Sequence, residues 1–257
     1  MRITGERIVT NEGGFNPTWQ RHTANYLFAA DSLAVTPTPG RVLDLGCGSG
    51  HAAHLFSPRW SVGVDLDHAA LAGQKRAGVQ SDIRRLPFCA GAFSAVVCLH
   101  AVEHVPDPER VVAECSRVVA PGGLVVMATP NRLTFGRPDE VIDPYHFVEF
   151  SPDQLRSLCA ARFPDVTLYG LVGSAQYMEF FQAERRKLDR LLGLDPLRLR
   201  RFVPRKLRQQ LYDWRLTQER RRDASPVAGR ITRDDFSWQQ DDLDDALDLI
   251  AVCRRGG

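Results

Sequence analysis

Three glycines in a G-x-G-x-G spacing, placed directly after a short apolar run, constrain this chain more than any other feature. The run at 42–45 holds a valine and two leucines and predicts a short buried strand, which Gly46, Gly48 and Gly50 follow. Glycine adopts positive φ at little cost and has no Cβ, so backbone amides in such a turn can approach a ligand closely. Residues 49–56 are predicted to begin a helix. A strand, a turn and a helix in this order bind nucleotide-like ligands at the carboxyl edge of a parallel sheet.

The glycine spacing alone is compatible with more than one ligand. From Gly48 to Ala53 the residues also fit G-x-G-x-x-A, which is typical of dinucleotide-binding proteins. Asp65 lies about 20 residues beyond Gly46, where an acid that binds a ribose is expected. A nicotinamide-dependent oxidoreductase therefore stays open at this point, as does a glycine turn that holds no ligand.

Size and composition indicate a protein with one sizeable core. The chain has 257 residues, 44% of them hydrophobic, and its net charge of +2 does not argue for nucleic acid. A charged N-terminus without an apolar signal core, and no apolar run long enough to span a bilayer, favour a cytoplasmic protein. The six cysteines never form C-x-x-C, so we expect reduced thiols and no structural zinc.

Apolar runs alternate with helical patterns along most of the chain, which predicts a doubly wound α/β fold with a mostly parallel sheet. Seven strands are predicted, at 42–45, 60–65, 78–81, 93–99, 124–128, 166–172 and 246–253. Helices are expected at 49–56, 68–77, from Pro106 onward, and at 151–163, where Ser151, Pro152 and Gln154 form a capping box. We expect an N-terminal helical arm (1–39), a core (40–175 and 241–257) and a basic helical insertion (176–240) before the last strand.

Five motifs occur in order along the chain. They are Val42–Gly50, Asp65-Leu66, Ser81–Ile83 with Leu86–Phe88, Glu103–Val105, and Arg117–Gly123. Together they resemble the class I S-adenosylmethionine-dependent methyltransferases, over about 41–172 and again from Ala246. The segment Thr4–Arg7 is similar to the N-terminal arm of a bacterial subgroup that is often associated with tailoring of glycans or natural products. A dehydrogenase would explain neither Asp82 nor the Pro-Gly-Gly element.

The resemblance implies a Rossmann-like methyltransferase sheet and S-adenosylmethionine as the cofactor. Backbone amides from Gly46 to Gly48 are expected to meet the carboxylate of its methionine end. Asp65 is expected to bind both ribose hydroxyls, and Asp82 the adenine amino group, with Ile83 against the ring. We expect Asp44 to brace the turn or a water molecule. The full expected cofactor-binding set is Asp44, Gly46, Cys47, Gly48, Asp65, Leu66, Asp82, Ile83 and His100.

The acceptor of the methyl group is expected near two clusters of candidate bases. A hydroxyl acceptor needs a base or a metal, because it is a poor nucleophile while protonated. His100, Glu103 and His104 follow the fourth predicted strand, and His146 lies in the segment 143–149 after the fifth. We rank His146 first as the general base and His104 second, with Glu103 beside them. The alternative for each histidine is a hydrogen-bonded residue that shapes the wall of the pocket.

Two other patterns near these bases are set aside. His100 to His104 spells the H-x-x-E-H pattern of zinc peptidases, but Pro106 interrupts the long helix which that site requires. The ubiquinone-biosynthesis O-methyltransferases carry a similar Glu-His-Val beside acids that can hold a divalent metal; here His100 replaces one acid, so no metal is expected. Asp143-Pro144-Tyr145 resembles the adenine-methylating motif but follows the wrong strand. Methylation of nucleic acid is therefore not expected.

The basic insertion has three interpretations. Residues 179–222 are rich in arginine with interleaved leucines, which fits a solvated helical face balanced by nearby acids. It also fits contact with an anionic membrane or nucleic acid, or a lid over the acceptor site. The sequence thus predicts an enzyme that methylates a small molecule, at a hydroxyl of a sugar, a lipid-linked glycan or a natural product. The alternatives are a cofactor-binding interaction protein without catalysis, and the nicotinamide oxidoreductase.

Overall fold

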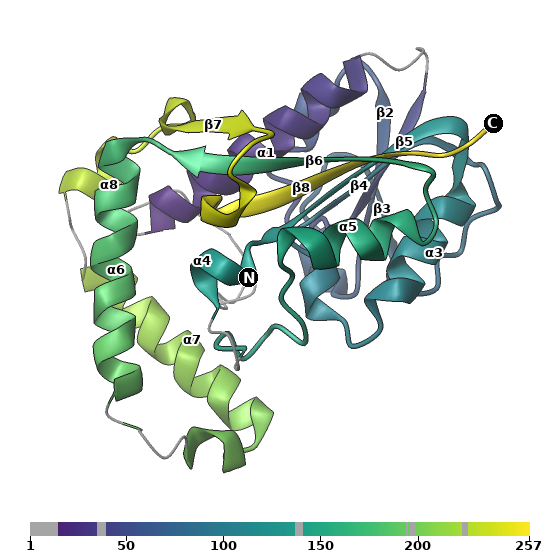
Figure 1. Ribbon diagram of the computed structural model, residues 1–257. Coiled ribbons are helices and arrows are strands. Elements are labelled where there is room, and N and C mark those ends of the chain that lie inside the picture. Colours follow the sequence, from purple (N-terminus) through teal and green to yellow (C-terminus); the bar gives the residue numbers. More distant parts are fainter. Residues whose placement is uncertain (1–14, 35–39, 137–140, 194, 196–198, 223–225) are drawn as a thin grey trace.

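One eight-stranded sheet forms the centre of the molecule (Figure 1). The computed structural model describes residues 15–34, 40–136, 141–193, 195, 199–222 and 226–257. The strands are β1 (Arg41–Leu45), β2 (Trp60–Asp65), β3 (Ala77–Gln80), β4 (Phe93–Leu99), β5 (Val119–Pro130), β6 (Asp165–Gly173), β7 (Phe236–Gln239) and β8 (Asp248–Arg254). Their order across the sheet is β3-β2-β1-β4-β5-β8-β6-β7.

The first five strands pair in parallel, and β8 runs antiparallel to both β5 and β6. This confirms the predicted doubly wound, mostly parallel sheet. The predicted number of seven strands is one too few, because β7 pairs antiparallel with β6 at the sheet edge. It lies inside 176–240, which was expected to be helical. Four residues beside charged segments are too short a run to stand out in the sequence.

Helices and short 3₁₀ turns connect the strands. The helices are α1 (Asn16–Ala34), α2 (His68–Leu71), α3 (Pro108–Val118), α4 (Arg132–Phe135), α5 (Pro152–Ala160), α6 (Ala175–Gly193), α7 (Arg205–Arg222) and α8 (Pro226–Arg230). The 3₁₀ turns are η2 (Ala53–Phe56), η3 (Val102–His104), η4 (Leu199–Phe202), η5 (Arg233–Asp235) and η6 (Leu243–Asp245). In the described part of the chain, no helix is both long enough and apolar enough to cross a bilayer.

Local signals explain where most helices begin. The capping box is present at α5, where the Ser151 side chain accepts from the Gln154 amide and the Gln154 side chain accepts from the Ser151 amide. Two expected helices are shorter than predicted. The segment 49–56 forms only η2, and 68–77 only α2, because glycines at Gly50 and Gly73 interrupt the helical pattern.

Alternating side chains along the strands build a core on each face of the sheet. On one face, Leu43 and Val96 pack with α3 and α5; on the other, Val42 and Val97 pack with α1. The segment 1–39, expected as an arm, therefore supplies a helix that covers the sheet. The Thr4–Arg7 motif lies outside the described residues.

Candidate active site

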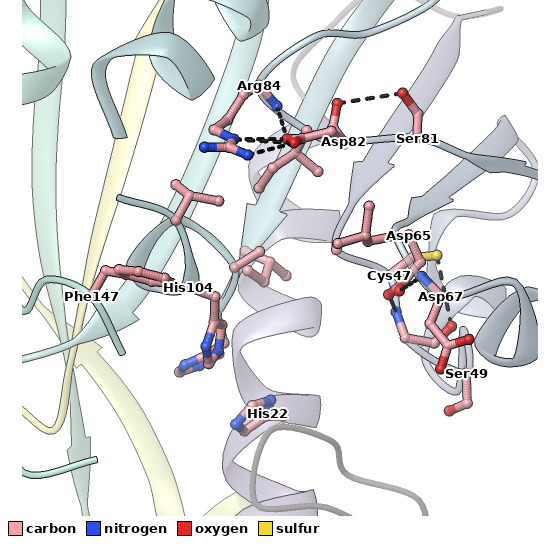
Figure 2. Close-up of a pocket in the computed structure, with 18 of the residues that line it drawn as sticks. His22, Cys47, Ser49, Asp65, Asp67, Ser81, Asp82, Arg84, His104 and Phe147 are labelled. Atoms are coloured by element: carbon pink, nitrogen blue, oxygen red, sulfur yellow. Dashed lines mark hydrogen bonds and ion pairs between the residues drawn. The ribbon is translucent and has the colours of Figure 1, made fainter. Parts of the chain in front are cut away.

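A cavity of about 700 Å³ opens at the carboxyl ends of β1 to β4 (Figure 2). β1 pairs with β2 on one side and β4 on the other, and the chain order reverses there. Ligands of open α/β sheets bind at such a point. Eight of the predicted cofactor-binding residues line the cavity, as does one predicted base: Gly46, Cys47, Gly48, Asp65, Leu66, Asp82, Ile83, His100 and His104.

Close backbone packing explains the first glycine of the turn. Gly46 has φ 66°, and a Cβ there would lie 2.4 Å from the Cβ of Ala101, in the loop after β4. Gly48 also has positive φ, 52°, but no atom lies within 4 Å of where its Cβ would be. The turn therefore passes tightly against the protein at Gly46 and stands open at Gly48.

The amides of this turn bind mainly to the protein itself. The Cys47 amide donates to the Val64 carbonyl at 3.0 Å, and the Gly48 amide donates to Asp65 Oδ2 at 2.9 Å. The expectation that amides from Gly46 to Gly48 receive a ligand carboxylate is wrong for these two. They instead tie the turn to the end of β2.

Asp65 is the most firmly held acid on the cavity wall. Its side chain is buried, and Oδ1 accepts from the Asp67 amide at 2.9 Å while Oδ2 accepts from Gly48. Each carboxylate oxygen has two lone pairs and can accept more than one hydrogen bond. The carboxylate is thus fixed in orientation before any ligand arrives, as a ribose-binding acid requires.

Asp82 is held differently, by an arginine that the sequence analysis did not single out. Arg84 donates to it from Nη2 at 2.7 Å and from Nε, and these hydrogen bonds hold the pKa of Asp82 below its usual value. Arg84 also lines the cavity, beside the buried Ile83 and the exposed Leu66. Asp82 and Ile83 therefore lie together, as an adenine site would need.

Asp44 is not part of the cavity wall, and its place in the predicted cofactor-binding set is wrong. Its carboxylate is fully buried and accepts from Arg76 Nη2 at 2.6 Å and from the Tyr26 hydroxyl at 3.3 Å. Asp44 lies on the face of β1 that α1 covers, as its contact with Tyr26 shows. Its carboxylate accepts from the side chains of Arg76 and Tyr26, whereas it was expected to brace the turn or a water molecule.

Helix α1 supplies a cavity wall that the sequence analysis missed. His22 and Tyr26, one helical turn apart, line the cavity, and the His22 ring stacks on His100 with centroids 3.9 Å apart. His100 has φ 54°, an unusual value outside glycine, and its Nε2 lies 2.8 Å from Asn25 Nδ2. Burial lowers the pKa of both histidines well below the usual value. In the sequence, the only indication of this wall was the spacing of His22 and Tyr26, four residues apart on one helix.

His51 is a further missed residue, directly after the glycine turn. It lines the cavity, and its Nε2 is buried with no hydrogen-bond partner among the described residues. Burial, with a smaller effect of His54, lowers the pKa of His51 to about 4. The ring is therefore neutral at pH 7. Burying a polar atom without a hydrogen-bond partner costs free energy, so this nitrogen is suited to form a hydrogen bond with a bound ligand.

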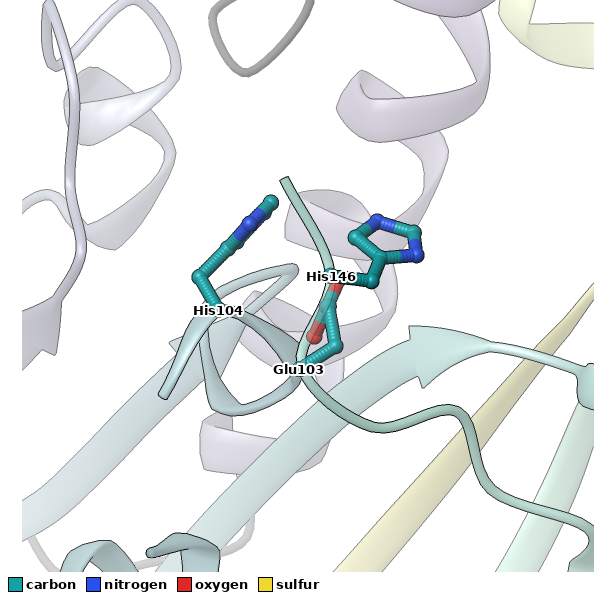
Figure 3. A group of neighbouring side chains, drawn as sticks. All are labelled: Glu103, His104 and His146. Carbon is teal, nitrogen blue, oxygen red and sulfur yellow. The ribbon is translucent and has the colours of Figure 1, made fainter. Parts of the chain in front are cut away.

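The predicted bases gather beside the cavity, but only one lines it. Figure 3 shows Glu103, His104 and His146 together, although His146 comes from a different loop. His104 lines the cavity, and the His146 ring lies behind it, with centroids 5.1 Å apart. Among the described residues, neither Glu103 nor His146 is in the cavity wall. Of the two histidines, His104 is therefore the one on the cavity wall, whereas the sequence analysis ranks His146 first as the base.

Hydrogen bonds orient both rings. His104 Nδ1 lies 3.3 Å from the Tyr145 carbonyl, which can only accept, so Nδ1 carries the proton and the basic lone pair is at Nε2. His146 Nδ1 lies 3.1 Å from Glu149 Oε1. Glu103 is buried, with Oε2 accepting from Thr129 at 3.0 Å.

Burial and neighbouring charges in this cluster shift the pKa values of His146 and Glu103. Burial lowers the pKa of His146, but the Glu149 hydrogen bond and the charges of Asp143 and Glu103 outweigh it and raise that pKa to about 8. Burial raises the pKa of Glu103 to about 7. Below pH 8, His146 is therefore a cation among carboxyl groups.

Glu103, His104 and His146 also offer ligand atoms within 4.8 Å of one another. Histidine and carboxylate side chains together form a ligand set that a divalent metal can use.

Comparison with known proteins agrees with this geometry. A family model described as a methyltransferase domain matches residues 43–127. A probable S-adenosylmethionine-dependent methyltransferase of Mycobacterium tuberculosis is 32% identical over 272 residues, covering 99% of this chain and 90% of that protein. The chain belongs to the S-adenosylmethionine-dependent methyltransferases. A similarly described protein of Mycolicibacterium smegmatis is 30% identical over 269 residues, covering 99% of this chain and 95% of that protein.

Solved structures share the fold of this methyltransferase at low identity. A possible histamine N-methyltransferase of Thermotoga maritima has a TM-score of 0.59 and 14% identity, covering 92% of this chain and 90% of that chain. The [4+2]-cyclase SpnF has a TM-score of 0.55 and 16% identity, covering 90% and 82%. Because these neighbours are named for different reactions, the fold alone does not select the acceptor.

The residues of the cavity fit the cofactor of the family. Asp65 presents a fixed carboxylate, and the open space at Gly48 lets a ligand lie against the turn. His51 offers the buried nitrogen that has no described protein partner. S-adenosylmethionine is therefore the cofactor of this methyltransferase, and the nicotinamide alternative is set aside.

Proposed function

We propose that this methyltransferase transfers the methyl group of S-adenosylmethionine to a hydroxyl oxygen of a small molecule, with His104 as the general base. The observation that carries the proposal is the His104 ring on the cavity wall, whose hydrogen bond to the Tyr145 carbonyl directs the basic nitrogen to Nε2. A hydroxyl needs such a base, because it attacks poorly while it keeps its proton. Sugars, lipid-linked glycans and natural products are the acceptor classes proposed.

The residues divide the work of an in-line displacement. When bound, S-adenosylmethionine supplies a methyl group on a positively charged sulfur, so correct positioning provides much of the acceleration. Asp65 orients the ribose, and Asp82 with Ile83 orients the adenine. His104 Nε2 would take the hydroxyl proton as the oxygen–carbon bond forms and the carbon–sulfur bond breaks, with its electron pair left on the sulfur. The protonation states of His146 and Glu103 determine the local charge next to the His104 ring.

A relative supports transfer to oxygen. A ubiquinone biosynthesis O-methyltransferase of Pseudomonas aeruginosa is 38% identical over 104 residues, which covers 36% of this chain and 45% of that protein. The chain thus spans less than half of that relative. Reaction at oxygen therefore rests mainly on His104.

A screen with labelled S-adenosylmethionine tests the proposal. Phenols, free sugars and glycolipids are offered as acceptors, each beside an amine of similar shape, and the labelled product is analysed for the bond formed. We expect label on oxygen. We also expect activity to survive treatment with a chelator, because the proposed base needs no metal. Label only on nitrogen, or activity restored only by a divalent metal after chelation, would contradict the mechanism.

Replacement of Asp65 by asparagine is expected to weaken cofactor binding by about 10- to 100-fold, because hydrogen bonds to a charged group contribute about 1.5–3 kcal/mol. Isothermal titration with S-adenosylhomocysteine measures the loss. Asp82→Asn is the matched control, since that carboxylate is partly exposed and already bound to Arg84. We expect Asp82→Asn to lose less affinity for S-adenosylhomocysteine than Asp65→Asn. Equal losses of affinity in both variants would show that Asp65 contributes no more to cofactor binding than Asp82 does.

The activity is expected to rise with pH around pH 8. His146 carries a proton below its raised pKa of about 8, and a second positive charge on the adjacent His104 ring is unfavourable. The pair therefore accepts a proton from the hydroxyl more readily once His146 is neutral. A profile of kcat/KM against pH checks this. Glu149→Gln should move the rise in activity to lower pH, because it removes the negative charge that stabilises protonated His146. A pH profile that does not move would show that the rise does not depend on His146.

A further inference from the structure

Helix α7 turns its polar side chains toward the protein. Arg205 donates from Nε to the Pro144 carbonyl at 2.9 Å and from Nη2 to the Tyr145 carbonyl at 2.8 Å. Asp213 accepts from the Tyr145 hydroxyl at 2.7 Å, and the Tyr212 hydroxyl donates to Asp143 at 3.3 Å. Positions 205, 209, 212 and 213 share one face of a helix, and that face is docked on the loop 143–147.

The opposite face of α7 exposes three large apolar side chains. Leu207, Leu211 and Trp214 are 55%, 62% and 63% exposed, and their spacing of four and three residues aligns them along the helix. Phe202 and Leu199, on the preceding η4, are 85% and 59% exposed. Of the ten exposed large apolar side chains in the described part of the chain, five thus lie between 199 and 214. We call these five residues the apolar ridge.

The three exposed apolar side chains of α7 therefore face away from the protein, whereas an ordinary surface helix buries its large apolar side chains. Exposed apolar patches of this kind mark a surface that is covered in function. The helix lies at the end of the molecule remote from the C-terminus (Figure 1). The ridge faces away from the loop that α7 holds.

Charge indicates what covers the ridge. Residues 175–230 contain 15 Lys and Arg against seven Asp and Glu, a net charge of +8, whereas the whole chain carries only +2. Lys206, within the ridge segment, is exposed. Aromatic and leucine side chains flanked by Lys and Arg are the composition of helices that lie in the interface of an anionic bilayer.

We propose that the apolar ridge docks this methyltransferase on the surface of an anionic lipid bilayer, with Phe202, Leu207, Leu211 and Trp214 entering the headgroup boundary. Lys206, which is exposed in the same segment, then reaches the lipid phosphates while its stem stays in the apolar layer. The inner face of α7 holds the loop that carries His146 and the cavity-lining Phe147. Docking would place helix α7 between the bilayer and this loop.

Vesicle sedimentation with the full chain tests the proposal independently of methyl transfer. The probes are vesicles of phosphatidylcholine with one-third phosphatidylglycerol, and vesicles of phosphatidylcholine alone. We expect the protein to bind the first at least about tenfold more tightly, and to lose affinity as salt rises. The double variant Phe202→Ser/Trp214→Ser should bind the anionic vesicles at least about tenfold more weakly.

The control variant is Trp60→Ser, which removes a tryptophan of similar exposure (56%) at the start of β2. It should sediment like the parent protein, and all variants should keep the parent melting temperature and affinity for S-adenosylhomocysteine. Three results would overturn the proposal: no sedimentation of the parent with anionic vesicles, equal sedimentation of the double variant, or a parent that self-associates through the ridge without binding vesicles.

Discussion

His104→Ala is expected to lower kcat by about 10²- to 10⁴-fold, the range that a positioned general base contributes. The affinity for S-adenosylhomocysteine should change little, because the cofactor is expected to contact chiefly Asp65, Asp82 and the glycine turn. His104 lines the cavity where the acceptor would bind, and the Tyr145 carbonyl holds the ring in one tautomer. Single-turnover rates measured beside a binding isotherm separate the two effects.

Two controls distinguish a base from a wall residue. His104→Gln keeps a polar side chain of similar length but cannot accept the proton, so it should be as impaired as the alanine variant. His146→Asn should lose less activity than His104→Ala, because His146 lies behind the cavity wall. If His104→Gln retained most of the parent rate, the ring would serve only to shape the pocket. If His146→Asn were the slower variant, the predicted order of the two histidines would stand.

Sequence reasoning could predict features that depend on neighbouring residues. The strand at 42–45, the glycine turn and the capping box at Ser151 each follow from local conformational preferences. Asp65 and Asp82 could be placed because parallel strands bring their carboxyl ends to one edge of the sheet. These expectations needed only the order of strands and the positions of turns.

The features that sequence reasoning missed depend on pairings between distant segments. The amides of Cys47 and Gly48 looked available for a ligand, but the end of β2 supplies acceptors for both. The ranking of His146 above His104 depended on the path of the loop 143–149. His22 lies on a helix that precedes the sheet, and only the packing of α1 brings it to the cavity.

The buried ion pair of Arg21 and Asp248 shows how such a distant pairing holds a cavity wall. Arg21, on α1, donates from Nε to Asp248 Oδ2 at 2.8 Å and from Nη2 to Oδ1. Asn25 donates to the same carboxylate at 2.7 Å and lies 2.8 Å from His100 Nε2. Burial lowers the pKa of Arg21, but the charge of Asp248 outweighs it and the net shift is upward. The network therefore ties α1 to β8 and orients His100 on the cavity wall.

Asp248→Leu is expected to lower the free energy of unfolding by about 3–5 kcal/mol, because it leaves the Arg21 cation buried without its partner. The double variant Arg21→Met/Asp248→Leu removes both charges and should recover most of that loss, since apolar residues can replace a buried ion pair at little cost. Urea unfolding followed by circular dichroism measures both. Both variants should also bind S-adenosylhomocysteine more weakly than the parent, because Asn25 loses the acceptor that orients it toward His100. A double variant no more stable than Asp248→Leu would mean that packing around β8, rather than the unpaired charge, accounts for the loss.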